Sequence, residues 1–311
     1  MSRKTAILGL VISVFVIVAL YFYSSMDEGV TPLMVAAKTG ETEVVRELIS
    51  EGVDLDQAST YGWTALMFAA WQGHEENVRA LVEGGADTNV VSGSVPASFS
   101  TTGDYPPTTA LFEAISNQHL HIAKYLLEKG ASVDAAAMAM AGWRGNPRLL
   151  AAMVEKGGQI NEVSDNAYYR TALSVAARYG NERNVEWLLS NGADPNQPLP
   201  YSSNLREAVR GLSLVCAARL ITSGADVDAP IGSTKTTALR EAVYVHTNNK
   251  HAEKIRIVEL LLANGADPTH TRNERDDTLI DHVELRVQRG IESSLNPEFS
   301  EEVRARYRRS L

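Results

Sequence analysis

The sequence contains a single cysteine, Cys216, so the chain cannot form an internal disulfide and offers no cysteine pair for zinc. Cys216 lies in the apolar segment 214–218, which predicts a buried structural thiol. The chain also lacks an HExxH helix, a GxSxG turn, a glycine-rich phosphate loop and a convincing nucleophile–base set. We therefore predict no catalytic, metal or cofactor site and no small-molecule substrate, and we expect that the protein is not an enzyme.

An excess of positive charge is also missing. The 311 residues include 29 lysines and arginines against 38 aspartates and glutamates, a formal net charge of −9. A general nucleic-acid binder needs a basic face for phosphates, so nucleic acid is not an expected partner. With 44% hydrophobic and 22% charged residues, the composition is that of a folded chain.

An uncharged hydrophobic run occupies residues 6–23. As a helix it would span about 27 Å, enough for a bilayer core. The basic pair 3–4 precedes it and the acidic pair 27–28 follows it, which by the positive-inside rule places residues 1–5 in the cytoplasm and the rest of the chain outside it. We therefore predict an uncleaved transmembrane signal-anchor helix. A signal peptide cleaved after Ser25 is the alternative, which the length of the run and its aromatic end disfavour.

A pattern of threonine, paired alanines and glycine recurs after this run. Residues 31–40 read Thr-Pro-Leu-Met-Val-Ala-Ala-Lys-Thr-Gly. Residues 64–73 and 171–180 have threonine, the alanine pair and glycine at the same places. Leucine-rich segments follow, and each ends at a second glycine, 21 residues after the threonine position. These second glycines are Gly52, Gly85, Gly130, Gly192 and Gly224.

Each feature of the pattern suits a helix–turn–helix unit. Thr31 is a predicted helix N-cap, and Pro32 suits the first helical position, where a missing N–H costs nothing. The paired alanines let neighbouring helices approach closely, and both glycines suit the left-handed positions that end helices. The second segment has apolar residues at helical spacing. Because no unit can bury its apolar face alone, the units must stack.

This pattern resembles the ankyrin repeat over about residues 27–290. The resemblance implies an all-α solenoid of about seven to eight units, some of them degenerate, with a charged C-terminal cap or tail at 291–311. The family's usual histidine, three residues after the threonine, is absent, which removes a hydrogen bond that typically ties neighbouring repeats together. Its replacements are Met34, Met67, Phe112 and Ser174.

The threonine-equivalent positions are about 33 residues apart, with exceptions. They are Thr31, Thr64, Thr109, Ala136, Thr171, Ser203, Thr237 and Thr278. The spacing from Thr109 to Ala136 is only 27, which predicts a truncated turn. The spacing from Thr237 to Thr278 is 41, which predicts a longer link between two helices at 244–251.

The largest excess, a spacing of 45 from Thr64 to Thr109, falls in an insertion loop at 92–107. The loop is rich in Ser, Thr, Gly and Pro and carries Phe99 and Tyr105. It is either a tolerated surface insertion or a part of the binding surface, because loops carry binding residues more often than the elements they connect.

In the ankyrin family, partners usually lie against the turns and the first helices, at the residue before the threonine and the two after the alanine pair. Aromatic and basic residues occupy these positions here, and these residue types are enriched at binding hot spots. With Phe99 and Tyr105, the predicted partner-binding residues are Trp63, Trp71, Trp143, Arg144, Arg170, Arg178 and Tyr179. The alternative is that the tryptophans pack on neighbouring turns and the arginines are solvated. The expected partner is another protein, with an acidic surface.

The sequence thus favours a membrane-anchored adaptor whose repeats bind a protein outside the cytoplasm, at the periplasmic face of the inner membrane if the source is bacterial. The alternative is an immunity or inhibitor protein that neutralises a toxin or hydrolase in the same compartment.

Overall fold

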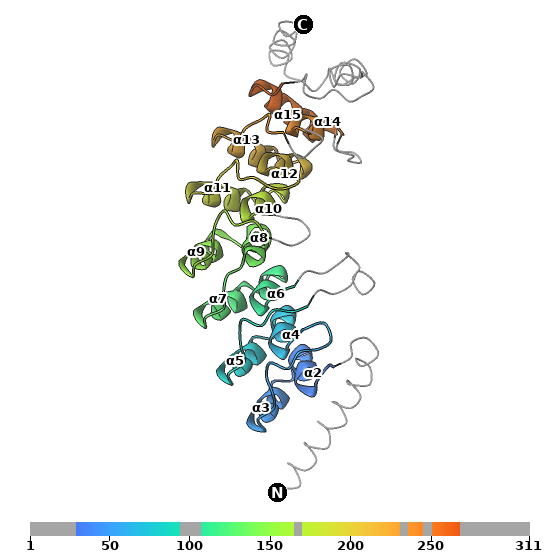
Figure 1. Ribbon diagram of the computed structural model, residues 1–311, viewed down its shortest axis with the longest axis vertical. Helices are drawn as coiled ribbons and strands as arrows, with labels where there is room; N and C mark the ends of the chain where they lie inside the picture. The colour runs from blue at the N-terminus through green and yellow to red at the C-terminus, as the bar shows by residue number, and fades with distance from the viewer. Residues whose placement is uncertain (1–28, 94–106, 165–169, 231–235, 245–250, 268–311) are drawn as a thin grey trace. The chain divides into compact units, whose positions relative to one another are not determined.

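The computed structural model describes residues 29–93, 107–164, 170–230, 236–244 and 251–267 (Figure 1). These ranges consist of paired helices and the turns between them, with an isolated antiparallel bridge between Leu199 and Ser202. Within them, no helix has the length and apolar character needed to cross a membrane. The predicted anchor, the unit at Thr278 and the tail lie outside the described residues.

The chain forms two compact units. Unit 1 covers residues 1–159 and 164–168, and its first helices α2, α4, α6 and α8 pack side by side in a row (Figure 1). Each second helix packs on the first helix of its own pair. The helices are α2 (Pro32–Thr39), α3 (Thr42–Ser50), α4 (Ala65–Gln72), α5 (Glu75–Glu83), α6 (Ala110–Ser116), α7 (Leu120–Glu128), α8 (Ala135–Arg144) and α9 (Pro147–Glu155).

Unit 2 covers residues 160–163 and 169–311 and is built in the same way. Its first helices α10, α12 and α14 form one row, and α11, α13 and α15 form the other. The helices are α10 (Ala172–Arg178), α11 (Glu182–Ser190), α12 (Asn204–Arg210), α13 (Leu214–Thr222), α14 (Ala238–Tyr244) and α15 (His251–Ala263). The predicted long link at 244–251 therefore does join two helices, α14 and α15.

The first helices begin where the pattern predicted, with one correction. The hydroxyl of Thr31 accepts a hydrogen bond from the N–H of Met34 at 3.2 Å, and the equivalent threonines 64, 109 and 171 act alike. The predicted start at Ala136 is wrong by two residues, because Asp134 caps α8 by accepting from the N–H of Ala137 at 2.6 Å. A carboxylate can satisfy this free N–H and an alanine side chain cannot.

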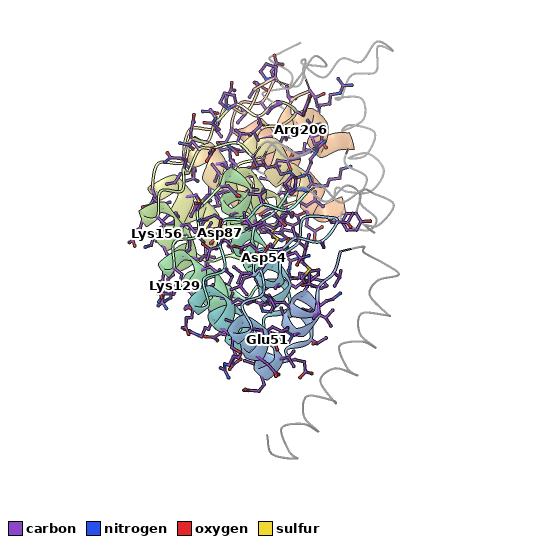
Figure 2. All side chains as sticks on the ribbon, turned by 60° about the horizontal axis from the view of Figure 1, so that its bottom comes forward. Glu51, Asp54, Asp87, Lys129, Lys156 and Arg206 are labelled. Carbon is purple, nitrogen blue, oxygen red and sulfur yellow. The ribbon has the colours of Figure 1, made fainter. Side chains whose placement is uncertain are left out.

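The core of each unit lies between its two rows of helices. The paired alanines are buried as predicted, with Ala37, Ala69 and Ala70 fully so, which lets the first helices pack closely. Cys216 is also fully buried, as predicted, and burial raises the pKa of its thiol. The residues that follow the second helices, such as Glu51, Lys129 and Lys156, are exposed (Figure 2).

Histidines elsewhere in the pattern tie neighbouring repeats of unit 1 together. The Nε2 atom of His74 lies 3.1 Å from the Lys38 carbonyl oxygen, and that of His119 lies 3.1 Å from the Trp71 carbonyl oxygen. A Cβ at Gly73, where φ is +82°, would lie 2.4 Å from the His119 ring. The loss of the usual histidine in the first helix therefore leaves other links between repeats in place.

The turns between repeats are joined by aspartate and asparagine side chains. Each side chain accepts a hydrogen bond from a backbone N–H of the next turn. The side-chain oxygen thus takes the place of water as the acceptor for that N–H. The pairs are Asp56–Asp87 and Asn89–Ser132 in unit 1, and Asn161–Asp194, Asn196–Asp226 and Asp228–Asp267 in unit 2, at 2.7–2.9 Å.

Candidate functional site

An aromatic cluster lies on the first-helix row of unit 1. It consists of Trp63, just before the N-cap of α4, with Phe68 and Trp71 of α4 and Lys38 of α2. The Trp63 ring centroid lies 5.0 Å from that of Phe68 and 5.9 Å from that of Trp71, the second pair edge-on at 90°. All three aromatic side chains are partly exposed. The cluster thus combines a large apolar area with access to a partner.

Lys38 gives the aromatic cluster a positive charge. Its Nζ lies 5.5 Å from the Phe68 ring centroid and 5.7 Å from that of Trp71, within the range of a cation–π interaction. Such a contact is worth about 0.5–1 kcal/mol at a partly exposed site. It holds the charge of α2 against the rings of α4.

Trp143 and Arg144 form a second aromatic and basic feature in unit 1, in the last turn of α8. The Arg144 guanidinium carbon lies 3.9 Å from the Trp143 ring centroid, and both residues are partly exposed. The buried Nε of Arg144 makes no hydrogen bond to any described residue. Both predicted residues therefore lie on the first-helix row, as do Trp63 and Trp71.

The first helices of unit 1 carry no exposed carboxylate within their bounds, and their one carboxylate cap, Asp134 of α8, is exposed. The charged residues within these helices are Lys38, Glu113 and Arg144, and Glu113 is fully buried. The second helices α3 and α5, in contrast, carry five carboxylates, those of Glu43, Glu47, Glu75, Glu76 and Glu83. The exposed side chains of the row are thus aromatic and, on balance, positive within a chain whose net charge is negative.

The ends of the insertion loop lie against the turn that carries Trp63. The N–H of Ser92 donates to the Thr108 carbonyl at 2.8 Å, and the N–H of Gly93 donates to the Tyr61 carbonyl at 2.9 Å. Phe99 and Tyr105 lie outside the described residues, so their role in binding stays a prediction.

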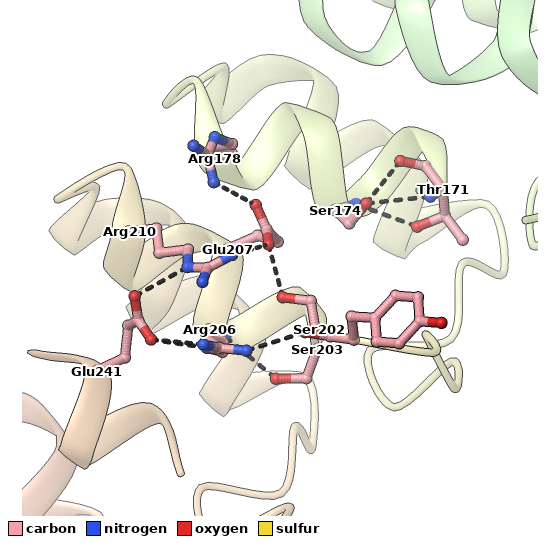
Figure 3. Close-up of polar contacts among 10 residues, drawn as sticks. Thr171, Ser174, Arg178, Ser202, Ser203, Arg206, Glu207, Arg210 and Glu241 are labelled. Atoms are coloured by element: carbon pink, nitrogen blue, oxygen red, sulfur yellow. Dashed lines mark hydrogen bonds and ion pairs between the residues drawn. The ribbon is translucent and has the colours of Figure 1, made fainter. Parts of the chain in front are cut away.

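In unit 2, the predicted residue Arg178 is part of an ion-pair network that pattern reasoning did not find (Figure 3). Arg178 Nη1 lies 2.9 Å from Glu207 Oε2, and Arg210 lies between Glu207 and Glu241, at 3.4 Å and 2.8 Å. Arg206 also pairs with Glu241, at 2.8 Å. Arg170 is partly exposed, and Tyr179 is 46% exposed. A repeated sequence, Leu-Arg-Glu-Ala-Val at 205–209 and 239–243, was the signal that could have revealed the two carboxylates.

Hydrogen bonds keep both carboxylates of this network ionised. Burial by itself would raise the pKa of Glu207, but donors from Ser202 and Arg178 outweigh it, so that pKa lies below its ordinary value. Burial opposes ionisation at Glu241 too, and hydrogen bonds from Arg210 and Arg206 lower its pKa in the same way.

The lowered pKa values predict acid sensitivity in unit 2. The ionised carboxylates of Glu207 and Glu241 stabilise the folded state fully above the unfolded-state pKa of about 4.3. This stabilisation is lost as the pH falls through their lower pKa values in the folded state. We expect the denaturant midpoint of the E207Q/E241Q variant to fall less than that of the wild type between pH 5 and pH 3. Urea titrations followed by circular dichroism would measure this, and equal falls in the two proteins would contradict it.

Within the described residues, no group of three or more His, Cys, Asp or Glu side chains is arranged to hold a metal ion. Each unit has a candidate surface of its own: in unit 1 the aromatic cluster with Trp143 and Arg144, and in unit 2 the arginine network with Tyr179.

A family model described as "Ankyrin repeats (3 copies)" matches residues 14–92 and 106–198, more than half of the chain. The chain belongs to the ankyrin repeat family. The first match begins inside the hydrophobic run predicted to be the anchor, and the anchor remains a prediction. Ankyrin repeats are typically protein–protein interaction modules without catalytic activity, which agrees with the nature of the candidate surface.

The crystal structure of the human ASB11 ankyrin repeat domain is similar in fold. It matches with a TM-score of 0.59 and 23% sequence identity, over 77% of this chain and 100% of that domain. No curated protein matches this sequence. The structural likeness establishes the ankyrin fold and leaves the partner to be argued from the surface.

Proposed function

We propose that this ankyrin repeat protein binds another protein through the first-helix row of unit 1, with the aromatic cluster as the main contact. The observation that carries the proposal is the cluster itself: three partly exposed rings and one lysine at α2 and α4, two helices that contain no carboxylate. Tryptophans in such a setting supply large contact areas at low entropic cost. An acidic protein surface is the complement of this row.

We further propose that the chain is held at a membrane by residues 6–23, with the repeats outside the cytoplasm. Support comes from the uncharged run and from the charge difference between its two ends. A reporter that is active only outside the cytoplasm, fused after Leu311, would be active if this topology is correct. A silent reporter in a stable, membrane-bound fusion would reject it.

The binding proposal is tested with the W63A/W71A variant of the full-length chain. The partner is first identified by affinity capture from detergent-solubilised membranes. Loss of two anchor tryptophans is expected to weaken the complex at least about thirtyfold, since a hot-spot side chain contributes about 2 kcal/mol or more. Isothermal titration calorimetry with the purified partner would measure the change. A captured toxin or hydrolase would favour the inhibitor role over the adaptor role.

The matched control is W187A, which removes a partly exposed tryptophan from the second helix α11 of unit 2. It is expected to keep wild-type affinity. Circular dichroism confirms that the variants are folded. Unchanged affinity in folded W63A/W71A would reject this surface as the binding site.

A further inference from the structure

Two arginines of unit 2 are held side by side by a buried carboxylate. Glu207 bonds Arg178 through one oxygen, at 2.9 Å, and Arg210 through the other, at 3.4 Å (Figure 3). The Glu207 side chain is only 3% exposed, whereas those of Arg178 and Arg210 are 31% and 33% exposed. The carboxylate therefore lies beneath, and the two guanidinium groups reach the surface above it.

Both guanidinium groups keep unused donors. Arg178 bonds Glu207 through Nη1 alone, and Arg210 uses Nε and Nη1 for the two glutamates. The Nη2 groups of both arginines, and Nε of Arg178, make no hydrogen bond to any described residue. Arg178, whose Nε–Nη2 edge is free, can bind a second carboxylate in the forked geometry that arginine favours, and Nη2 of Arg210 can donate to the same group.

The surroundings of this arginine pair have the composition of a binding surface. Tyr179 directly follows Arg178 and is 46% exposed, and Tyr201 is 69% exposed. The Tyr201 carbonyl accepts a hydrogen bond from Arg206 at 2.9 Å, which holds its backbone beside the network. Arginine and tyrosine are both enriched at interface hot spots.

Charge indicates which kind of partner fits. The network contains three arginines and two glutamates, so it is net positive in a chain of net charge −9. We propose that Arg178 and Arg210 form an anion-binding pair that takes the carboxylates of an acidic segment of a partner protein. Glu207 positions the pair and does not contact the partner. This proposal rests on the proposed function, because it takes the ligand to be a protein.

The test uses a fluorescently labelled deca-glutamate peptide and the purified full-length chain in detergent. Fluorescence anisotropy at low ionic strength is expected to show binding of deca-glutamate and none of deca-glutamine, and raising the salt concentration is expected to weaken it. The R178Q/R210Q variant is expected to lose at least tenfold in affinity.

A second variant guards against loss of folding, because R178Q/R210Q leaves Glu207 buried without its arginines. The triple variant R178Q/E207Q/R210Q removes the buried charge as well, and is expected to be folded and to show the same loss. The control R183Q/R256Q removes two exposed arginines from the second helices α11 and α15 and is expected to stay within twofold of the wild type.

Three results would overturn the site: no binding by the wild type, wild-type affinity in the folded triple variant, or an equal loss in R183Q/R256Q. The arginine pair is tested by the deca-glutamate affinity of the triple variant, and the aromatic cluster by the partner affinity of W63A/W71A. Failure of the one is therefore distinguishable from failure of the other.

Discussion

Gly211→Ala is expected to destabilise unit 2 by about 3 kcal/mol, at the upper end of the usual cost of overpacking. Gly211 is the C-cap of α12, and an added Cβ would lie within 2 Å of the backbone carbonyl oxygen of Arg178 in α10. A backbone atom cannot turn aside as a side chain can, so α10 and α12 would have to separate. The unfolding midpoint in urea, followed by circular dichroism, measures the effect.

Gly84→Ala is the matched control. Gly84 is the C-cap of α5 in almost the same backbone conformation, with φ −74° and ψ −10° against φ −75° and ψ −7° for Gly211. Its added Cβ would meet the Ala80 carbonyl and the end of the Ile49 side chain at 3.0 Å. We expect a change within about 1 kcal/mol, because the gain from a less flexible unfolded chain offsets a tight contact. Equal losses of stability in the two variants would contradict this explanation, because only Gly211 lies against the backbone of a neighbouring helix.

Glu207→Ala is expected to lower the stability of unit 2 by about 3 kcal/mol, the lower end of the range for removing one partner of a buried ion pair. The lower end applies because Arg178 and Arg210 are about one third exposed and Arg210 keeps Glu241 as a partner. The loss also leaves the Ser202 hydroxyl without its 2.6 Å acceptor. Urea unfolding at pH 7 measures the change.

Glu186→Ala is the control for this substitution. Glu186 pairs with Arg219 at 3.8 Å, and both side chains are more than half exposed. A solvated pair of this kind contributes little, so we expect a change below about 0.5 kcal/mol. If Glu186→Ala were as destabilising as Glu207→Ala, the burial of the network would not be the cause.

The repeat could be predicted because its signals are local. A threonine cap, an alanine pair and a left-handed glycine each act within one helical turn, and the structure confirms them at Thr31, Ala37 and Gly40. The pattern failed at the degenerate unit at Ala136, where Asp134, two residues earlier, is the better N-cap.

The binding surface could be predicted only in part, because its contacts join different repeats. The pattern placed Trp63 and Trp71 on the first-helix side, but the position of Lys38 over the rings depends on how closely α2 and α4 pack. The pattern also treated Arg178 as a solvated or partner-binding charge. Its link to Glu207 crosses from α10 to α12, a distance that no spacing within one repeat reveals.

Site-specific photo-crosslinking tests the central claim most directly. Trp71 is replaced by benzoylphenylalanine in the full-length chain, and the same probe is placed at Lys124, an exposed position on the second helix α7 of the same unit. If the first-helix row binds a protein, irradiation in membranes gives one discrete crosslinked product from position 71 and none from position 124. A product from position 124 alone would contradict the account.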